Sequence, residues 1–506
     1  MGRAMRSLLW SLRLFVFALV AGTLNATWSI ILVDMRTGEI AIASATCLTG
    51  FDLESGACVV VVGHGAAAAQ SFVDTTGQNR QLIFAQLQAG TSPAQILALL
   101  AASDSQHQTR QYGIVDVLGR AIGFTGTGAG QWAGDVAGQI GTIAYAIQGN
   151  VLTGAPVVNA ALQAVQNTPG DLADKLMAAM EAARLMGGDG RCSCSNGNPT
   201  GCGSPPPTFT KAADVGYMLI ARPGDLDGIC NAAVGCANGS YYMNLNVANS
   251  LSIDPDPVLQ LRARFLNWRL QHVLRPDHFL STVEVDPARL LDDGITQGRL
   301  RITLRDWRGV RLPFGGAQVA VAAEAGSPPL QIGAPIDNGD GSYTVPIGPA
   351  ALAGTARLRV TVNDGLGNVR LAPSPEVAIT GDSLWLSSGG IDAFGGSFDA
   401  VLRGGVPLAN RPSMLVASFA GTTPGIQLAP GIVLPLNPDA LTYIMVDLAQ
   451  TGSVLGGLLD AQGRRTVPLS VPPGLFLQQR GSQLDFAFLT LVPIDFTSNP
   501  ATLQLR

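Results

Sequence analysis

The spacing of apolar residues changes near residue 281, and this change constrains the fold more than any other feature of the sequence. Before it, segments with the two-residue period of strands alternate with segments of helical period. After it, short strand-like segments follow one another around turns rich in Gly, Pro, Asn and Asp. A chain of 506 residues also exceeds what one core holds. The sequence therefore predicts a multidomain protein, an α+β sandwich followed by two all-β sandwich domains.

The first half begins with a predicted β-hairpin, "TWSIILVD" and "EIAIASA" around the turn "MRTG". The stretch "ACVVVVGHGAAAAQ" is predicted as one buried strand with a small-residue tail. Residues 78–103 are predicted as two helices, the second capped by Ser92 with Pro93 in its first position. Further strands are predicted at "QYGIVDV", "AIGFTG" and "TIAYAIQGNVL", and a helix capped by Thr168 at "TPGD".

In the second half, "DNGDGSYTV" predicts a hairpin turn rather than a calcium loop, since it lacks the spacing and the closing Glu of such a loop. The stretch "TYIMVDLAQ" in the last block is predicted as a strand. These patterns divide the chain into five predicted segments: a signal peptide at 1–26, an α+β domain at 27–250, a helical linker at 251–280, and β-sandwiches at 281–380 and 381–506.

Residues 1–26 have the features of an export signal. Arginines precede an apolar segment, and small residues follow with Ala26 at a cleavage point. A cut after Ala21 and an uncleaved anchor are the alternatives. Cleavage after Ala26 would make Thr27 the first residue of the mature chain. The prediction is a secreted, cell-surface or periplasmic protein with no stable membrane span after cleavage.

Charge and cysteine content limit the other classes. The formal net charge is -5 and no basic tract occurs, so a nucleic-acid partner is not predicted. Seven cysteines fit an oxidising compartment and predict two or three local disulfides with one thiol left over, in a pairing that the sequence leaves open. A zinc site is the alternative, but the C-x-C-x7-C spacing has no histidine nearby. No metal or cofactor is predicted. The cysteines lie in three loops: Cys47 and Cys58, then Cys192, Cys194 and Cys202, then Cys230 and Cys236.

Several separated motifs of the first half agree, in order, with one known family. They are "TWSIILVDMRTGEIAIASA", "RQYGIVDVLGRAIGFTG", "QGNVLTGAPVVNAALQA" and "GGDGR". On these motifs residues 27–250 resemble the domain of unknown function family 1028, which implies the N-terminal nucleophile (Ntn) hydrolase fold, an αββα sandwich. Residues 281–380 are similar to an invasin-type or filamin-type immunoglobulin-like repeat through "DNGDGSYTV". Residues 381–506 resemble a β-sandwich module found at the ends of exported bacterial proteins.

The resemblance implies a catalytic role for Thr27. In Ntn hydrolases the hydroxyl of the first residue attacks a carbonyl carbon, and its own α-amine, which titrates near neutrality, takes the proton. Asn150, at a strand end, is a candidate oxyanion donor; the alternative is a turn residue. Asp189 and Arg191 of "GGDGR" are candidates for binding a substrate carboxylate; the alternative is a salt-bridged loop.

Two functions from different classes remain open on the sequence. The first is an exported amidohydrolase with Thr27 as nucleophile, acting on an unknown amide. The second is a non-catalytic exported scaffold that binds an extracellular ligand and carries adhesive β-sandwich modules. The absence of lysine from "IAIASATC" favours the second, because related enzymes place a lysine beside the threonine, and the only lysines are Lys175 and Lys211.

Overall fold

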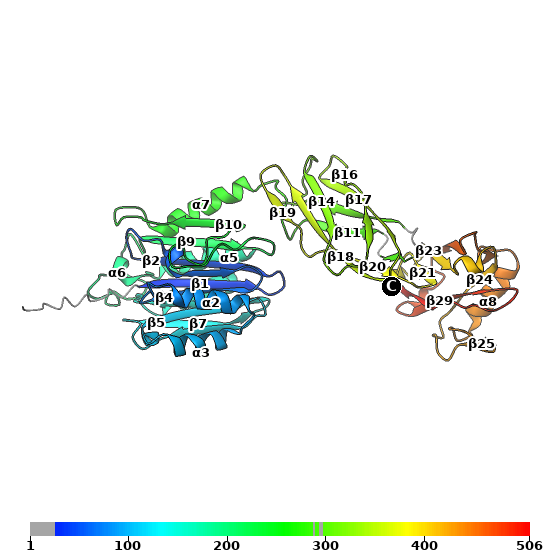
Figure 1. Cartoon of the computed structure of the whole chain (residues 1–506), viewed down its shortest axis with the longest axis horizontal. Coiled ribbons are helices and arrows are strands. Elements are labelled where there is room, and N and C mark those ends of the chain that lie inside the picture. The colour runs from blue at the N-terminus through cyan, green and yellow to red at the C-terminus, as the bar shows by residue number, and fades with distance from the viewer. Residues whose placement is uncertain (1–25, 287–288, 293–296) are drawn as a thin grey trace, which may run out of the picture. The chain divides into compact units, whose positions relative to one another are not determined.

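The computed structural model describes residues 26–286, 289–292 and 297–506. It divides into two compact units, one ending at His272 and the other beginning at Val273, which are described separately (Figure 1). Apart from Ala26, the predicted signal peptide 1–26 lies outside the described residues. None of the helices in the described ranges is long and apolar enough to cross a bilayer.

The first unit is built on two antiparallel sheets. Strand β1 lies inside the larger sheet, where it pairs with β2 in the predicted hairpin and with β8. The order in the larger sheet is β10 (Met243–Val247), β9 (Val215–Ala221), β2 (Glu39–Thr46), β1 (Thr27–Asp34), β8 (Ile143–Asn150), β7 (Ala133–Ile140). The order in the smaller sheet is β3 (Cys58–Val61), β4 (Gly65–Ser71), β5 (Arg110–Asp116), β6 (Ala121–Thr125).

Three cores join these sheets to each other and to the helices. One core lies between the sheets and includes Ile31 and Ile42 of the larger sheet and Val60 of the smaller one. The helices α4, α5 and α7 pack on the other face of the larger sheet, and α2 and α3 pack on the smaller sheet. The layers therefore run helices, sheet, sheet, helices. The helices are α1 (Leu53–Ala57), α2 (Gln78–Gln88), α3 (Pro93–Ser103), α4 (Pro156–Asn167), α5 (Leu172–Leu185), α6 (Gly190–Ser193) and α7 (Pro257–Gln271).

Helix ends follow local capping chemistry. Helix α3 begins as predicted, with Ser92 accepting a hydrogen bond from the Gln95 amide and Pro93 in the first turn. The prediction for α5 was wrong by one turn: its cap is Asp171, not Thr168. Asp171 forms a reciprocal capping box with Asp174, and this arrangement satisfies two backbone amides that the threonine could not reach.

One strand prediction was wrong in the smaller sheet. "ACVVVVGHGAAAAQ" is not a single strand but the hairpin β3–β4, which reverses between Val61 and Gly65. Gly63 has a φ of +74°, a left-handed conformation that suits glycine at a tight turn. The uninterrupted apolar and small residues on both sides hid this turn from pattern analysis.

The second unit consists of many strands arranged around two cores, in agreement with the predicted all-β second half. Residues of the first core fall between 283 and 379, and those of the second between 384 and 505. The predicted turn at "DNGDG" joins β16 to β17 in an antiparallel pair. The first group of strands is β11 (Thr282–Asp286), β12 (Arg289–Leu291), β13 (Gly298–Thr303), β14 (Gln318–Ala323), β15 (Leu330–Ile332), β16 (Ile336–Asp337), β17 (Ser342–Ala350), β18 (Gly354–Asn363), β19 (Asn368–Arg370) and β20 (Glu376–Thr380).

The last block contains one helix that the sequence prediction missed. "TYIMVDLAQ" lies in α8 (Ala440–Gln450), not in a strand. Asp439 caps this helix and forms a capping box with Thr442, which outweighs the β-propensity of the aromatic and branched residues that follow. The strands here are β21 (Leu384–Leu386), β22 (Gly390–Ile391), β23 (Gly396–Arg403), β24 (Pro412–Ser418), β25 (Ile426–Ala429), β26 (Ile432–Leu434), β27 (Gly456–Leu458), β28 (Arg464–Val471), β29 (Gln483–Thr490) and β30 (Ala501–Leu505).

Candidate functional site

Thr27 is the first residue of β1 and is almost completely buried, with 1% of its surface exposed. Two of the predicted site residues meet here, because Thr27 lies directly opposite Asn150 in the β1–β8 register. The peptide that joins Thr27 to Ala26 is buried as well, since Ala26 has no exposed surface. Within the described part of the chain, the Thr27 hydroxyl takes part in no hydrogen bond.

Polar side chains connect the two sheets beside Thr27. Gln70, from β4 of the smaller sheet, donates from Nε2 to the Thr27 carbonyl oxygen at 2.8 Å and to Gln111 Oε1 at 2.8 Å. Its own Oε1 accepts a hydrogen bond from Ser29 Oγ at 2.5 Å. Burying these polar groups is tolerable because they are paired. They fix the start of β1 against the facing sheet.

The Asn150 side chain is held in place by its neighbours. Its Nδ2 donates to the Ala129 carbonyl at 3.1 Å and to Ser71 Oγ at 3.3 Å. Ser71 and Val151 both have positive φ, 75° and 53°. Such conformations cost about 1–3 kcal/mol each and cluster at functional sites. To stabilise an oxyanion, the Asn150 amide would have to exchange one of these bonds.

Asp189 and Arg191 lie beside the same end of β1. Asp189 is fully buried, and its carboxylate forms a salt bridge with Arg191 in which Nη2 and Oδ2 are 2.8 Å apart. The chain turns at Gly187 and Gly188 just before Asp189, and both glycines have positive φ. A Cβ on Gly188 would lie 2.7 Å from the Trp28 ring, so only glycine allows this approach.

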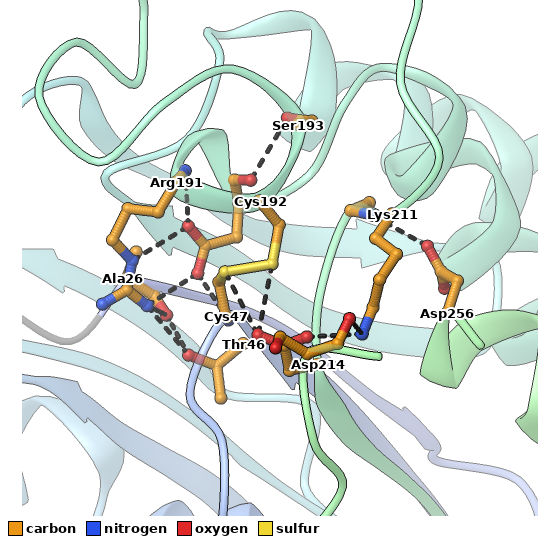
Figure 2. The surroundings of a disulfide bond; sticks show 12 residues. Ala26, Thr46, Cys47, Arg191, Cys192, Ser193, Lys211, Asp214 and Asp256 are labelled. Carbon is orange, nitrogen blue, oxygen red and sulfur yellow. Dashed lines mark hydrogen bonds and ion pairs between the residues drawn. A yellow bond between two sulfur atoms is a disulfide. The ribbon is translucent and has the colours of Figure 1, made fainter. Parts of the chain in front are cut away.

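The Ala26 carbonyl oxygen accepts two hydrogen bonds in this site. Arg191 Nη2 donates to it at 3.1 Å, and Thr46 Oγ1 donates to it as well. Figure 2 shows Arg191 reaching toward Ala26 and Thr46. Because the Thr27 nitrogen is bonded to the same carbonyl carbon, the guanidinium lies within roughly 5 Å of that nitrogen. The Arg191 guanidinium, paired with the Asp189 carboxylate, therefore lies near the Thr27 nitrogen.

The two lysines of the chain are used elsewhere. Lys175 donates to the carbonyl groups of Val165 and Thr168, and Lys211 is 2.5 Å from Asp214 in a salt bridge. Neither contact involves Thr27.

The buried Asp189 carboxyl has a shifted pKa. Burial raises the pKa of Asp189, while the hydrogen bonds from Arg191 and the Cys47 amide oppose that shift.

Six of the seven cysteines form three disulfides, which leaves Cys58 as a buried free thiol. The prediction of a single leftover thiol is confirmed, but the prediction that all pairs are local was wrong. Cys47 pairs with Cys192 across 145 residues. Both cysteines lie within 4.8 Å of an Asp214 oxygen, but their sulfurs are joined to each other. The other pairs are Cys194–Cys202 and Cys230–Cys236.

A cavity of about 550 Å³ opens at the end of the smaller sheet where β4 finishes at Ser71 and β5 begins at Arg110. Phe72, in its wall, directly follows Ser71, and Ser71 pairs with Arg110, also in the wall. The Asp104 carboxylate, which Arg110 contacts at 2.8 Å, has its pKa lowered to about 2, because hydrogen bonds and the positive charge of Arg110 outweigh its burial. Phe51 adds an apolar side.

Sequence reasoning missed three contributors to this site. Gln70 is the last residue of the run "AAAAQ". A glutamine that follows predicted buried alanines could have indicated a polar contact between the sheets. Thr46 belongs to the lysine-free stretch "IAIASATC", and nothing in the sequence indicates that it contacts Ala26. The long-range partner of Cys47 could not be derived from spacing, because pairing in space depends on the fold.

Comparison with known proteins agrees with the first two resemblances, at the start and in the middle of the chain. Residues 27–197 match the model of DUF1028, a family of unknown function, and residues 277–381 match invasin domain 3. No curated protein matches the chain. A DUF1028 protein from Silicibacter pomeroyi of known structure is 20% identical, with a TM-score of 0.34, over 48% of this chain and 88% of that one.

An adhesin and an invasin of known structure also match. One, from Yersinia pseudotuberculosis, is 18% identical over 45% of this chain and 59% of that one, with a TM-score of 0.18. The other, invasin, described as a bacterial integrin-binding protein, is 15% identical over 58% of this chain and 46% of that one, with a TM-score of 0.19. From the two family models, the chain carries a DUF1028 domain at residues 27–197 and an invasin domain 3 at residues 277–381.

Proposed function

We propose that the protein is an exported amidohydrolase of Ntn type in which Thr27, freed by cleavage after Ala26, is the nucleophile. The observation that carries the proposal is the surroundings of Thr27. It begins an inner strand, faces Asn150, and has Arg191 hydrogen-bonded to the carbonyl that precedes it. The order of layers, with two sheets between helices, suits the same enzyme class.

In the proposed reaction, the Thr27 hydroxyl attacks the amide carbon of the substrate and its α-amine takes the proton. The nearby guanidinium of Arg191 supports this role, because a positive charge lowers the pKa of an amine and favours its neutral form, while the Asp189 carboxylate offsets part of this effect. Arg191 would thereby replace the missing lysine. Thr46 Oγ1 and Arg191 Nη2 both donate to the Ala26 carbonyl oxygen, which the proposed cleavage removes. In its place, the same two groups are suited to stabilise the oxyanion of the substrate.

The decisive test starts with the N-terminus of the exported protein, determined by intact mass and sequencing. Turnover is then measured on a panel of N-acyl amino acid p-nitroanilides and short peptide amides. We expect a free Thr27 amine, loss of turnover in Thr27→Ala, and partial turnover in Thr27→Ser, which keeps a hydroxyl. Thr142→Ala, at an exposed turn at the far end of β8, is the control and should behave as wild type. A chain that begins elsewhere would refute the proposal.

The second candidate is a non-catalytic exported scaffold, and the match to invasin domain 3 favours it. In that case the β-rich second unit would bind an extracellular ligand and the first unit would serve as a structural domain. This function requires neither a free Thr27 amine nor its hydroxyl. Thr27→Ala would then leave the activity of the protein, cell-surface binding, unchanged.

A further inference from the structure

The two groups that hold the Ala26 carbonyl come from segments far apart in the sequence. Thr46 ends β2, and Arg191 belongs to the short helix α6. In both segments the next residue is a cysteine, and these two cysteines form the disulfide that spans 145 residues. Figure 2 shows this bond between the Thr46 and Arg191 segments. The covalent link thus lies one residue from each carbonyl donor.

A single carboxylate supplies the non-covalent link between the same segments. Asp189 Oδ2 accepts a hydrogen bond from the Cys47 amide at 2.6 Å and lies 2.8 Å from Arg191 Nη2. Two donors reach one oxygen only within a narrow range of distance and angle. The relative position of the Thr46 and Arg191 side chains therefore depends on how firmly their segments are joined.

We propose that the Cys47–Cys192 disulfide is a positioning element of the Thr27 site, holding Thr46 and Arg191 where both can bind one acyl oxygen. Its catalytic consequence rests on the proposed amidohydrolase function. Both cysteines are half-buried residues. Dithiothreitol gives two electrons and two protons to the bond, which becomes two thiols, and is itself oxidised to its cyclic disulfide. Asp189 is then the remaining link.

The chain contains a matched control. Cys230 and Cys236 close a loop with a sequence separation of six residues, and neither lies next to a group that binds Ala26. Removing this pair tests the general effect of losing a disulfide from the same unit. Removing Cys47 and Cys192 has a second effect, because it also lets the Thr46 and Arg191 segments move relative to each other.

The test is hydrogen–deuterium exchange of the amide at position 47 and of residues 189–193. In Cys47→Ala/Cys192→Ala we expect exchange about tenfold faster or more, because the hydrogen bond from the amide at position 47 to the Asp189 carboxylate opens more often without the covalent link. Cys230→Ala/Cys236→Ala should match wild type. Reducing the folded wild-type protein with dithiothreitol should give the same increase while its near-ultraviolet circular dichroism stays native. This second measurement needs no variant to fold. Equal exchange in all samples would overturn the proposal.

Turnover separates this inference from the function on which it rests. If both hold, kcat falls in Cys47→Ala/Cys192→Ala with a smaller change in KM, because the donors act on the developing oxyanion. If wild type hydrolyses nothing but the exchange difference persists, the amidohydrolase proposal fails and the positioning role stands. If exchange rises but kcat is unchanged in an active enzyme, the disulfide does not position the catalytic donors and the proposal fails.

Discussion

At the scale of single residues, Glu54 combines burial with a titratable group. It lies in α1 with 5% of its surface exposed, and Asn244 Nδ2 donates to its Oε1 at 2.6 Å. Burial raises its pKa from 4.5 to about 7, and the negative charge of Asp52 adds to the shift, against the opposing effect of Asn244. The first unit therefore holds a carboxyl that is half-protonated near neutral pH.

This raised pKa predicts how the stability of the first unit changes with pH. Between about pH 4.5 and 7 the unfolded chain has lost the Glu54 proton while the folded chain keeps it, so the free energy of unfolding falls as the pH rises. The Glu54 contribution to this fall is about 3 kcal/mol. Urea unfolding at several pH values should show it in wild type and not in Glu54→Gln, which retains an acceptor for Asn244. Glu181→Gln, on the outer helix α5, should keep the wild-type pH profile. An identical profile in Glu54→Gln would contradict the prediction.

At the scale of elements, the turn between α5 and α6 determines how closely the Asp189 segment approaches β1. Gly188 has a φ of +52°, and a Cβ there would lie 2.7 Å from the Trp28 ring. Gly188→Ala should therefore lower the free energy of unfolding by about 1–3 kcal/mol through strain and overpacking. Because Trp28 directly follows Thr27, the Gly188→Ala substitution should also move the start of β1. Gly197→Ala, where no atom lies within 4 Å, is the control and should unfold like wild type. Equal urea midpoints for the two variants would refute this account.

Elements were predictable where the deciding interactions are local. The hairpin β1–β2 and the capped start of α3 depend on residues within a few positions of one another, and the sequence predicted both. The failures have a different cause. The β3–β4 turn lies within an unbroken apolar run, and the capping box of α8 competes with strand-forming side chains that follow it. Local patterns support both alternatives there, and tertiary packing decides between them.

The site was less predictable than the elements, because its contacts are long-range. Thr27 and Asn150 could be singled out from the sequence, but their direct pairing comes from the β1–β8 register. The contact between Arg191 and the Ala26 carbonyl joins residues 165 positions apart. Neither spacing nor periodicity contains that information, since it depends on how two sheets and several loops assemble.

At the scale of the whole molecule, the two compact units should unfold independently. All seven cysteines, and so all three disulfides, lie in the first unit, which ends at His272. A disulfide spanning 145 residues stabilises a fold by about 5 kcal/mol through loop entropy. For a unit of this size, losing it should lower the melting temperature by about 10 °C or more. Calorimetry of the full chain should therefore show two transitions, and dithiothreitol should lower only one. Segments 27–272 and 273–506, expressed separately, should each reproduce one transition, with the reductant acting on the first alone. A single transition, or a shift of both, would show that the units fold as one.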